Sequence, residues 1–496
     1  MSTERLISTQ GIRCKLTSNG LVGIDQLLVS DTAESSNNYF DCFPSIDSSA
    51  VAGTLPFKDI LYCSVLDDDV YEISYAQSHK NSIVTKKLMA QIEDPTRQFK
   101  FSSPTELCKI INDKAYENSQ VSPSILILIN PNGGQGKASR IFDEDIKPVL
   151  QAAHVSLEVM ETKYSGHARD IAKDLDISKY DMIVCCSGDG IPHEVINGFY
   201  QHPDRGVAAF NKLAVTQLPC GSGNALSLST HGTNDAKVAT LRMLKSRRTK
   251  LDLMAVTQAT DDGGELTSLS FCSQCYGAVA DSDIGTEHLR WMGPIRFDLG
   301  VAHKVFTRAR YPCDLYVKYQ TQTKEELIDF FNENYENQKS KSLKVLTEDD
   351  FKLLAPKLTD KPPTDWIEVD DSIASNISIF YIGKVPMVSS DTQFFPAALP
   401  NDGSMDMIIT DVNTPLMDSV KALLSVDKGR HIDYDGVLHN KISAYRLVPK
   451  LPEHSNHYIS IDGENFPFRT MQVEVLPGIL TGLLDNGLFV DTSLKK

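Results

Sequence analysis

The chain lacks several features that would place it in common classes of protein. No apolar run approaches the roughly 20 residues needed to cross a bilayer, and no apolar segment follows the opening residues 1–5 as a secretory signal requires. We therefore expect a cytoplasmic protein. Positive charge is also scarce, because 49 Lys and Arg stand against 65 Asp and Glu, a formal net charge of −16. This balance argues against a nucleic-acid-binding surface.

The cysteines and histidines follow no metal or disulfide pattern. All 10 cysteines lie at or before Cys313 and are scattered. Cys272 and Cys275 form a CxxC pair, but without a second pair we expect a strand there rather than a zinc site. The histidines have no metal-ligand spacing, and we expect no structural metal.

Three glycine-rich turns, each after a short apolar run, are the most informative feature of the sequence. They read Asn130-Pro131-Asn132-Gly133-Gly134-Gln135-Gly136-Lys137, then Ser187-Gly188-Asp189-Gly190, and then Gly221-Ser222-Gly223-Asn224. Glycines let backbone N–H groups approach an anion closely, and a helix that starts behind them adds its positive end. The turns therefore predict a phosphate site, with the Asp189 carboxylate aimed at whatever reacts with the phosphate.

Two common nucleotide motifs are incomplete in these turns. A Walker A motif needs a glycine six positions before its lysine and a Ser or Thr after it, but Pro131 and Ala138 stand at those positions around Lys137. Leu226 stands where a dinucleotide fingerprint needs its third glycine. The turns belong to another type of phosphate site.

The periodicity of the chain predicts its organisation. Residues 1–120 contain short strand-like pieces among polar residues and are interpreted as an N-terminal accessory region. In residues 121–258 strands alternate with helices, which predicts a doubly wound α/β domain with its ligand at the carboxyl ends of the strands. In residues 259–496 a period of two dominates, which predicts a mainly antiparallel β domain. A polar, partly helical insertion is expected at about 324–361.

The three turns together resemble the catalytic domain of the diacylglycerol-kinase-like lipid kinases. Within this superfamily, the chain resembles most the sphingosine (sphingoid long-chain-base) kinases, and especially their fungal members. This narrower resemblance lies in residues 276–283, 290–297 and 427–431. The resemblance covers about residues 124–477. It implies an ATP-dependent kinase that phosphorylates the primary hydroxyl of sphingosine, dihydrosphingosine or phytosphingosine. A ceramide or diacylglycerol kinase, or an inactive lipid- or nucleotide-binding scaffold, stays open as an alternative.

The resemblance also implies roles for individual residues. Asp189 would be the catalytic base that takes the proton of the lipid hydroxyl. Mg²⁺ would accompany ATP, with Glu464 as an indirect ligand. The residues implied to bind ATP are Asn130, Pro131, Asn132, Gly133, Gly134, Gly136, Thr162, Gly221, Ser222, Gly223, Arg290, Arg296, Asp462, Gly463 and Glu464. Those implied to contact the lipid are Ser187, Gly188, Asp189, Gly190, Asp281 and Asp283.

Asp281 and Asp283 carry the argument for the substrate class. We expect them to alternate along a strand, where their carboxylates would share a face and repel each other unless a cation is near. A sphingoid base has an ammonium on the carbon beside its reacting hydroxyl, and the resemblance implies that Asp283 binds it. Ceramide and diacylglycerol have no such charge, so a buried carboxylate would stay unpaired at a cost. A solvent-exposed acidic turn is the alternative.

A protein that phosphorylates a lipid must reach a membrane. We expect peripheral association with a membrane surface, and Cys42, between Phe40 and Phe43, is a candidate for palmitoylation. A homodimer is left open. Glu194 is expected to steady the Asp189 turn rather than to touch the substrate. The role of the Asp402-Gly403 turn is also left open.

Overall fold

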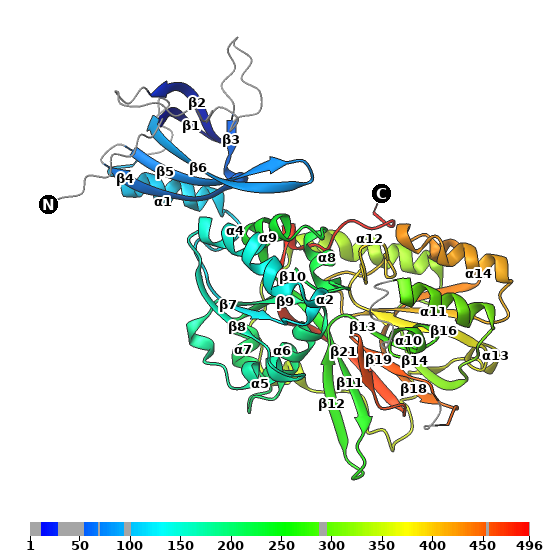
Figure 1. Cartoon of the computed structure of the whole chain (residues 1–496). Coiled ribbons are helices and arrows are strands. Elements are labelled where there is room, and N and C mark those ends of the chain that lie inside the picture. Colours follow the sequence, from blue (N-terminus) through cyan, green and yellow to red (C-terminus); the bar gives the residue numbers. More distant parts are fainter. Residues whose placement is uncertain are drawn as a thin grey trace. The chain divides into compact units, whose positions relative to one another are not determined.

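The computed structural model describes residues 11–27, 54–67, 70–93, 101–286, 295–452 and 456–495. The chain divides into two compact units (Figure 1). The first unit comprises Met1–Pro123, Phe142–Ser156 and Asp235–Lys245, and the second comprises Ser124–Ile141, Leu157–Asn234 and Ser246–Lys496. Cys42 and Arg290 lie outside the described residues.

A six-stranded sheet in the order β3-β2-β1-β6-β5-β4 forms the main part of the first unit. Neighbouring strands are antiparallel except β1 and β6, which are parallel. Helix α1 packs on β4, because Asn112 bonds both the N–H and the C=O of Cys63 (2.8 and 3.0 Å). The elements of this unit are β1(Gly11–Thr17), β2(Gly20–Leu27), β3(Thr54–Pro56), η2(Phe57–Asp59), β4(Ile60–Asp67), β5(Val70–His79), β6(Ser82–Glu93), α1(Pro104–Ala115), the π-helix η3(Phe142–Ile146), α4(Lys147–Ala152) and α9(Ala236–Lys245).

The second unit contains a four-stranded sheet in the order β10-β9-β7-β8. β9 is the parallel neighbour of both β7 and β10, and these three strands are almost entirely buried, as expected when both faces of a parallel sheet are covered. The prediction of a doubly wound α/β domain is confirmed. Its elements are β7(Ser124–Ile129), α2(Gly133–Gly136), α3(Ala138–Ile141), β8(Ser156–Glu161), α5(His167–Lys173), η4(Ile177–Lys179), β9(Met182–Ser187), α6(Gly190–Tyr200), α7(Val207–Lys212), β10(Ala214–Pro219) and α8(Ala225–His231).

An antiparallel sheet of 11 strands makes up the rest of the second unit, along the path β12-β11-β21-β18-β17-β16-β13-β19-β20 with β14 beside β18 and β15 beside β14. The predicted antiparallel β domain is confirmed, while the division at residue 258 stays a prediction, since β11 crosses it. The strands are β11(Arg247–Ala259), β12(Glu265–Ser270), β13(Ser273–Gly277), β14(Cys313–Tyr319), β15(Ile367–Glu368), β16(Ile377–Gly383), β17(Met405–Asp411), β18(Val437–Pro449), β19(Ile459–Ile461), β20(Glu464–Phe466) and β21(Met471–Leu484). The helices are α10(Ala278–Asp283), α11(Ile295–Phe306), α12(Lys324–Ser340), η6(Glu348–Phe351), α13(Asp371–Ala374), α14(Leu416–Leu423), η7(Val426–Lys428), η8(His431–Asp433) and η9(Asp485–Gly487).

One apolar core joins the two sheets of the second unit. Leu126 of β7 and Ile183 of β9 belong to the same group of packed, buried side chains as Leu251 of β11 and Leu480 of β21. The loops at the ends of the parallel strands are thereby held in place against the antiparallel sheet. No helix among the described residues is long and apolar enough to span a membrane.

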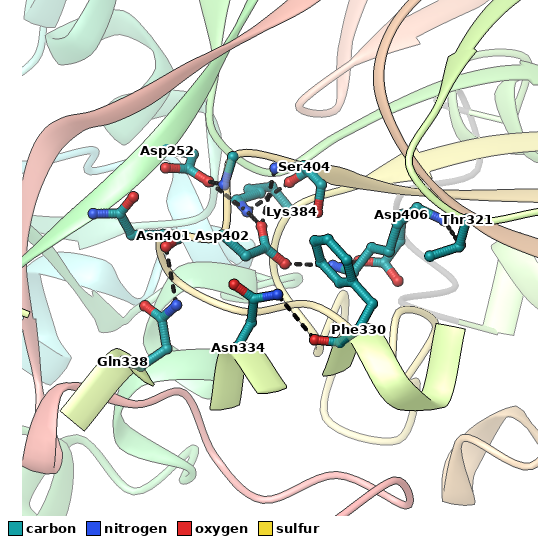
Figure 2. A network of polar contacts seen from close by, with 12 residues as sticks. Asp252, Thr321, Phe330, Asn334, Gln338, Lys384, Asn401, Asp402, Ser404 and Asp406 are labelled. Carbon is teal, nitrogen blue, oxygen red and sulfur yellow. Dashed lines mark hydrogen bonds and ion pairs between the residues drawn. The ribbon is translucent and has the colours of Figure 1, made fainter. Parts of the chain in front are cut away.

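Charged side chains are also buried in the antiparallel sheet (Figure 2). Lys384, directly after β16, pairs with Asp252 (2.8 Å) and Asp402 (2.5 Å). Lys441 of β18 pairs with Asp402 and Asp406 (both 2.8 Å). Each of these side chains is 2% exposed or less. We call these five residues the buried ion network. Each carboxylate oxygen of Asp402 therefore pairs with one buried lysine, so that these two ion pairs hold the Asp402-Gly403 turn.

Candidate active site

The three glycine-rich turns lie at the carboxyl ends of neighbouring parallel strands. The Asn130 N–H donates to the Cys186 carbonyl (3.4 Å), which joins the first turn to the second. A Cβ on Gly221 would lie 2.2 Å from Gly188 Cα, so the second and third turns touch and only glycine fits there. A Cβ on Gly133 would lie 3.7 Å from the Cys220 carbonyl oxygen, which places the first turn beside the third. The structure therefore brings the three predicted turns together at one edge of the sheet.

Asn130 stabilises the first turn through its side chain and its backbone carbonyl. Asn130 Oδ1 accepts from the Asn132 N–H (3.1 Å), and the Asn130 carbonyl accepts from the Gly133 N–H (2.9 Å). Gly136 has φ +76°, a left-handed conformation that favours glycine. The Thr162 N–H donates to the carbonyl of Ile129, the last residue of β7 (2.8 Å), so Thr162 lies beside this turn.

Asp189 directly precedes α6 and is anchored through one oxygen. Its Oδ1 accepts from the Ala225 N–H (2.8 Å) and from Gln217 Nε2 (3.2 Å). Its Oδ2 lies 2.6 Å from the position that a Cβ on Gly223 would take, so that glycine leaves room for the carboxylate. Burial raises the pKa of Asp189 to about 6, against the lowering effect of the two hydrogen bonds. A carboxylate with this pKa is ionised at neutral pH and can accept a proton.

Of the segment 462–464, Glu464 lies at the Asp189 turn. Its Oε1 is 2.8 Å from the position of a Cβ on Gly190. Asp462 is buried instead, and its carboxylate bonds His193 Nδ1 (2.8 Å) and Ser270 Oγ (2.7 Å). It also accepts from the backbone N–H groups of residues 271–273 (3.2, 2.9 and 2.9 Å). The protein itself occupies both carboxylate oxygens of Asp462, and its implied contact with the nucleotide stays a prediction.

Glu194, on α6, ties the Asp189 turn to the neighbouring helix. Its carboxylate accepts from the N–H groups of Gly166 (2.8 Å) and Ala168 (2.9 Å) at the start of α5. This contact fits the expected steadying role. His193, one residue earlier, is held by Asp462. Burial alone would lower the pKa of His193, but the hydrogen bond and charge of Asp462 outweigh it and raise that pKa.

The expectation that Asp281 and Asp283 alternate along a strand is wrong. Gly277, with φ +99°, ends β13, and both aspartates lie in α10, where residues two apart point to different sides. Asp281 is buried, pairs with Lys304 Nζ (2.8 Å) and accepts from the Tyr311 hydroxyl (2.8 Å). The cation that its charge requires comes from the protein itself, so we assign Asp281 no contact with the lipid.

Asp283, at the end of α10, is half-buried and connects to the strand that leads to Glu464. Its Oδ2 accepts from Ser460 Oγ of β19 (2.8 Å). Arg296 Nη1 donates to the Asp283 carbonyl (3.0 Å) and to Thr286 Oγ1 (2.8 Å). Arg296 thus stands at the carboxyl end of α10, and its contact with the nucleotide stays a prediction.

A cavity lies in the antiparallel sheet, close to α10. Ile379, one of its lining residues, pairs with Gly277, the residue just before that helix. Its walls come from α11, α14, β16 and β17, and its apolar lining includes Phe394, Ile408 and Leu423.

Sequence analysis missed Gln217 and the cavity. Gln217 stands inside the buried run of β10, and a polar residue in such a run is the signal that could have marked it, because buried polar side chains need specific partners. The cavity had no sequence signal, since its lining comes from segments far apart in the chain.

Comparisons with known proteins agree with this site. Residues 124–256 match the family model of the diacylglycerol kinase catalytic domain. The chain is 40% identical, over 95% of its length and 73% of the relative's, to sphingoid long chain base kinase 5 of Saccharomyces cerevisiae. It is 30% identical, over 89% of its length and 90% of the relative's, to sphingoid long chain base kinase 4 of Schizosaccharomyces pombe. The structure of a putative diacylglycerol kinase from Bacillus anthracis aligns with 73% of this chain and with 97% of its own chain, at 18% sequence identity and a TM-score of 0.48.

The fold and the turns define a class, that of kinases built on a diacylglycerol kinase catalytic domain. Within that class, the chain belongs to the sphingoid long chain base kinase family. The resemblance inferred from the glycine-rich turns is confirmed.

Proposed function

We propose that this enzyme transfers the γ-phosphate of ATP to the primary hydroxyl of a sphingoid long-chain base. The observation that carries the proposal is the setting of Asp189, a half-buried carboxylate with a pKa of about 6 among three glycine-rich turns. Its family relatives support a sphingoid base as the lipid.

The three turns would surround the ATP phosphates, because their glycines let the phosphates approach the backbone closely. The residues proposed to form this cradle are Asn130, Pro131, Asn132, Gly133, Gly134, Gly136, Thr162, Gly221, Ser222 and Gly223. Glu464 Oε1 lies at Gly190 of the Asp189 turn, where this carboxylate would bind Mg²⁺ indirectly, through water, because Mg²⁺ keeps several of its water ligands. Bound Mg²⁺ would neutralise charge on the phosphates.

Asp189 would act as the general base. Its Oδ1 is anchored by Gln217 and Ala225, which leaves Oδ2 to take the proton of the lipid hydroxyl. As the lipid oxygen bonds to the γ-phosphorus, the bond from that phosphorus to the β–γ bridging oxygen breaks, and ADP leaves. The anchoring contributes by holding the base in one orientation before the reaction.

Asp283 would bind the ammonium of the sphingoid base. The Asp283 carboxylate accepts from the Ser460 hydroxyl of β19, the strand that leads to Glu464 at the Asp189 turn, whereas the Asp281 carboxylate pairs with Lys304. The cavity beside α10 would take the hydrocarbon chain. A ceramide or diacylglycerol would bring no positive charge to Asp283, and this difference disfavours both as substrates.

The outer sides of α11 and α14 would meet the membrane. Leu299 and Phe306 on α11, Met417 on α14 and Leu424 directly after α14 are 55–77% exposed. Other residues of both helices line the cavity, and Figure 1 shows the two helices side by side. Exposed apolar side chains around a lipid cavity would let the enzyme take its substrate from a bilayer surface. Weaker flotation of Met417→Gln/Leu424→Gln with lipid vesicles would support this contact, and unchanged flotation would refute it.

The Asp189→Asn variant tests the proposed chemistry. It should abolish phosphate transfer to dihydrosphingosine while ATP binding, followed by calorimetry, stays within about twofold of wild type. The exposed Asp174→Asn is a matched control that should keep wild-type transfer. Transfer by Asp189→Asn near the wild-type rate would exclude Asp189 as the base. Wild-type ATP binding without transfer to any lipid would favour a scaffold.

A further inference from the structure

Gln217 is a fully buried side chain of β10 that reaches the Asp189 turn. Its Nε2 donates to the Ser187 carbonyl and to Asp189 Oδ1 (both 3.2 Å), and its Oε1 accepts from the Ser227 N–H (2.9 Å). We propose that Gln217 is a positioning residue, which orients the Asp189 carboxylate so that Oδ2 faces the lipid hydroxyl. This inference rests on the proposed function, in which Asp189 is the base.

The three partners fix the orientation of the Gln217 amide. The Ser227 N–H can only donate and the Ser187 carbonyl can only accept, so the amide oxygen must face Ser227 and the amide nitrogen must face Ser187. A flipped amide would lose both bonds and would set an oxygen against the Asp189 carboxylate. The Gln217 side chain therefore donates a hydrogen bond to Asp189. It also links the second glycine-rich turn to α8, the helix that follows the third turn.

The other ionisable groups around Asp189 do not supply this donor. Asp462, at the end of β19, raises the pKa of Asp189 by charge repulsion. His193 on α6 bonds Asp462 instead, Glu464 is itself an acid, and the buried Cys272 thiol is neutral because burial raises its pKa well above the usual value. Among the described residues, the hydrogen bonds to the Asp189 carboxylate come from other groups.

The hydrogen bonds that do stabilise the carboxylate come from Gln217 and from the backbone N–H groups of Ala225 and Leu226. They lower the pKa of Asp189, whereas burial raises it, to about 6 overall. Only the Gln217 donor can be removed by substitution. Its loss should destabilise the ionised base, so that the pKa of Asp189 rises further and its carboxylate loses one anchor.

The Gln217→Leu variant tests the inference, with Thr216→Val as a matched control. Thr216 is the preceding residue of β10, equally buried, and bonds His231 instead of Asp189. We expect Gln217→Leu to lower kcat about tenfold at pH 7 and to move the acid limb of the kcat/KM profile up by roughly one pH unit. The KM for ATP should stay unchanged, and Thr216→Val should keep the wild-type profile.

A second variant separates positioning from a merely structural role. Gln217→Glu can share a proton with Asp189, as paired carboxyls do, and should move the acid limb further in the same direction. A structural role would lower stability and the active fraction without moving the limb. An unmoved limb in both Gln217 variants would overturn the inference and leave the proposed function standing.

The position of the Asp189 titration can also be measured without turnover. The difference in Tm between wild type and Asp189→Asn changes with pH only between the unfolded and the native pKa of Asp189, so its midpoint lies between these two values. In the Gln217→Leu background that midpoint should move to higher pH. If the wild-type protein transfers no phosphate to a sphingoid base, the proposed function fails. The shift of the Tm midpoint in the Gln217→Leu background, or its absence, still decides whether Gln217 holds Asp189.

Discussion

Replacing Lys384 by Met would remove one cation from the buried ion network. Lys384 Nζ pairs with Asp252 (2.8 Å) and Asp402 (2.5 Å) and donates to the Ser404 carbonyl (2.6 Å). Met keeps most of the side-chain volume but leaves Asp252 without its cation and Asp402 with Lys441 alone (Figure 2). Removing one partner of a buried ion pair costs about 3–5 kcal/mol, because the remaining charge is left without compensation.

The loss should be close to that of one pair rather than two. Burial already raises the pKa of Asp252, so this carboxyl takes up a proton when Lys384 is gone and thereby limits the cost. Asp402 keeps Lys441 at 2.8 Å. We therefore expect Lys384→Met to lower the free energy of unfolding by about 4 kcal/mol, a large share of the typical 5–15 kcal/mol. At about 1–2 °C per kcal/mol, the value that an unfolding entropy of roughly 2.1 cal/mol/K per residue gives for a unit of this length, the Tm should fall by roughly 4–8 °C.

Urea and thermal unfolding measure this loss, with Lys421→Met as the matched control. Lys421 pairs with Asp418 on the surface of α14 (3.1 Å, side chains 55% and 45% exposed). Such pairs contribute about 0.2–1 kcal/mol, so the control should unfold almost as wild type does. A Tm of Lys384→Met equal to or above that of wild type would refute the reasoning, since it would mean that the buried charges carry no net stability.

Three further predictions concern the site. Transfer activity should fall as the pH drops through about 6, the pKa of Asp189. Because that pKa lies above its unfolded value of about 3.9, the ionised Asp189 carboxylate lowers the stability of the folded protein above pH 6. Asp189→Asn should therefore raise the Tm at pH 8 and not at pH 4. An equal change in Tm at the two pH values would contradict this. Asp283→Asn should raise the KM for the base at least tenfold with little change in Tm, whereas Asp281→Asn should chiefly lower the Tm; the reverse pattern would exchange their roles. Gly221→Ala should cost most of the activity, measured as kcat/KM for ATP, because its Cβ would lie 2.2 Å from Gly188 Cα; wild-type kinetics would show that the turns need not touch.

The parallel strands and their turns could be predicted because their signals are local. The run from Ile125 to Ile129 is apolar throughout and ends at a glycine-rich turn, and the same holds before Ser187. Strand, turn and helix succeed one another within a few residues, so the sequence pattern alone places Asp189 at the carboxyl end of a strand.

The features that sequence analysis missed depend on contacts between distant residues. The alternation of Asp281 and Asp283 is typical of a strand, but the left-handed Gly277 ends the strand and a short helix follows. Asp462 resembles a ligand-binding acid, yet its partners are about 190 residues away in sequence or further. Lys384 and Lys441 carry charges that usually lie on a surface, and only the folded sheet brings carboxylates to them.

Transfer of labelled γ-phosphate from Mg-ATP to a matched panel of lipids tests the central claim most directly. The panel contains dihydrosphingosine, phytosphingosine, ceramide and diacylglycerol, with Asp283→Asn assayed beside wild type. We predict label on the two free bases alone, and weaker labelling of both by Asp283→Asn. Label on ceramide or diacylglycerol, or no label on any lipid, would contradict the proposal that this enzyme phosphorylates sphingoid bases.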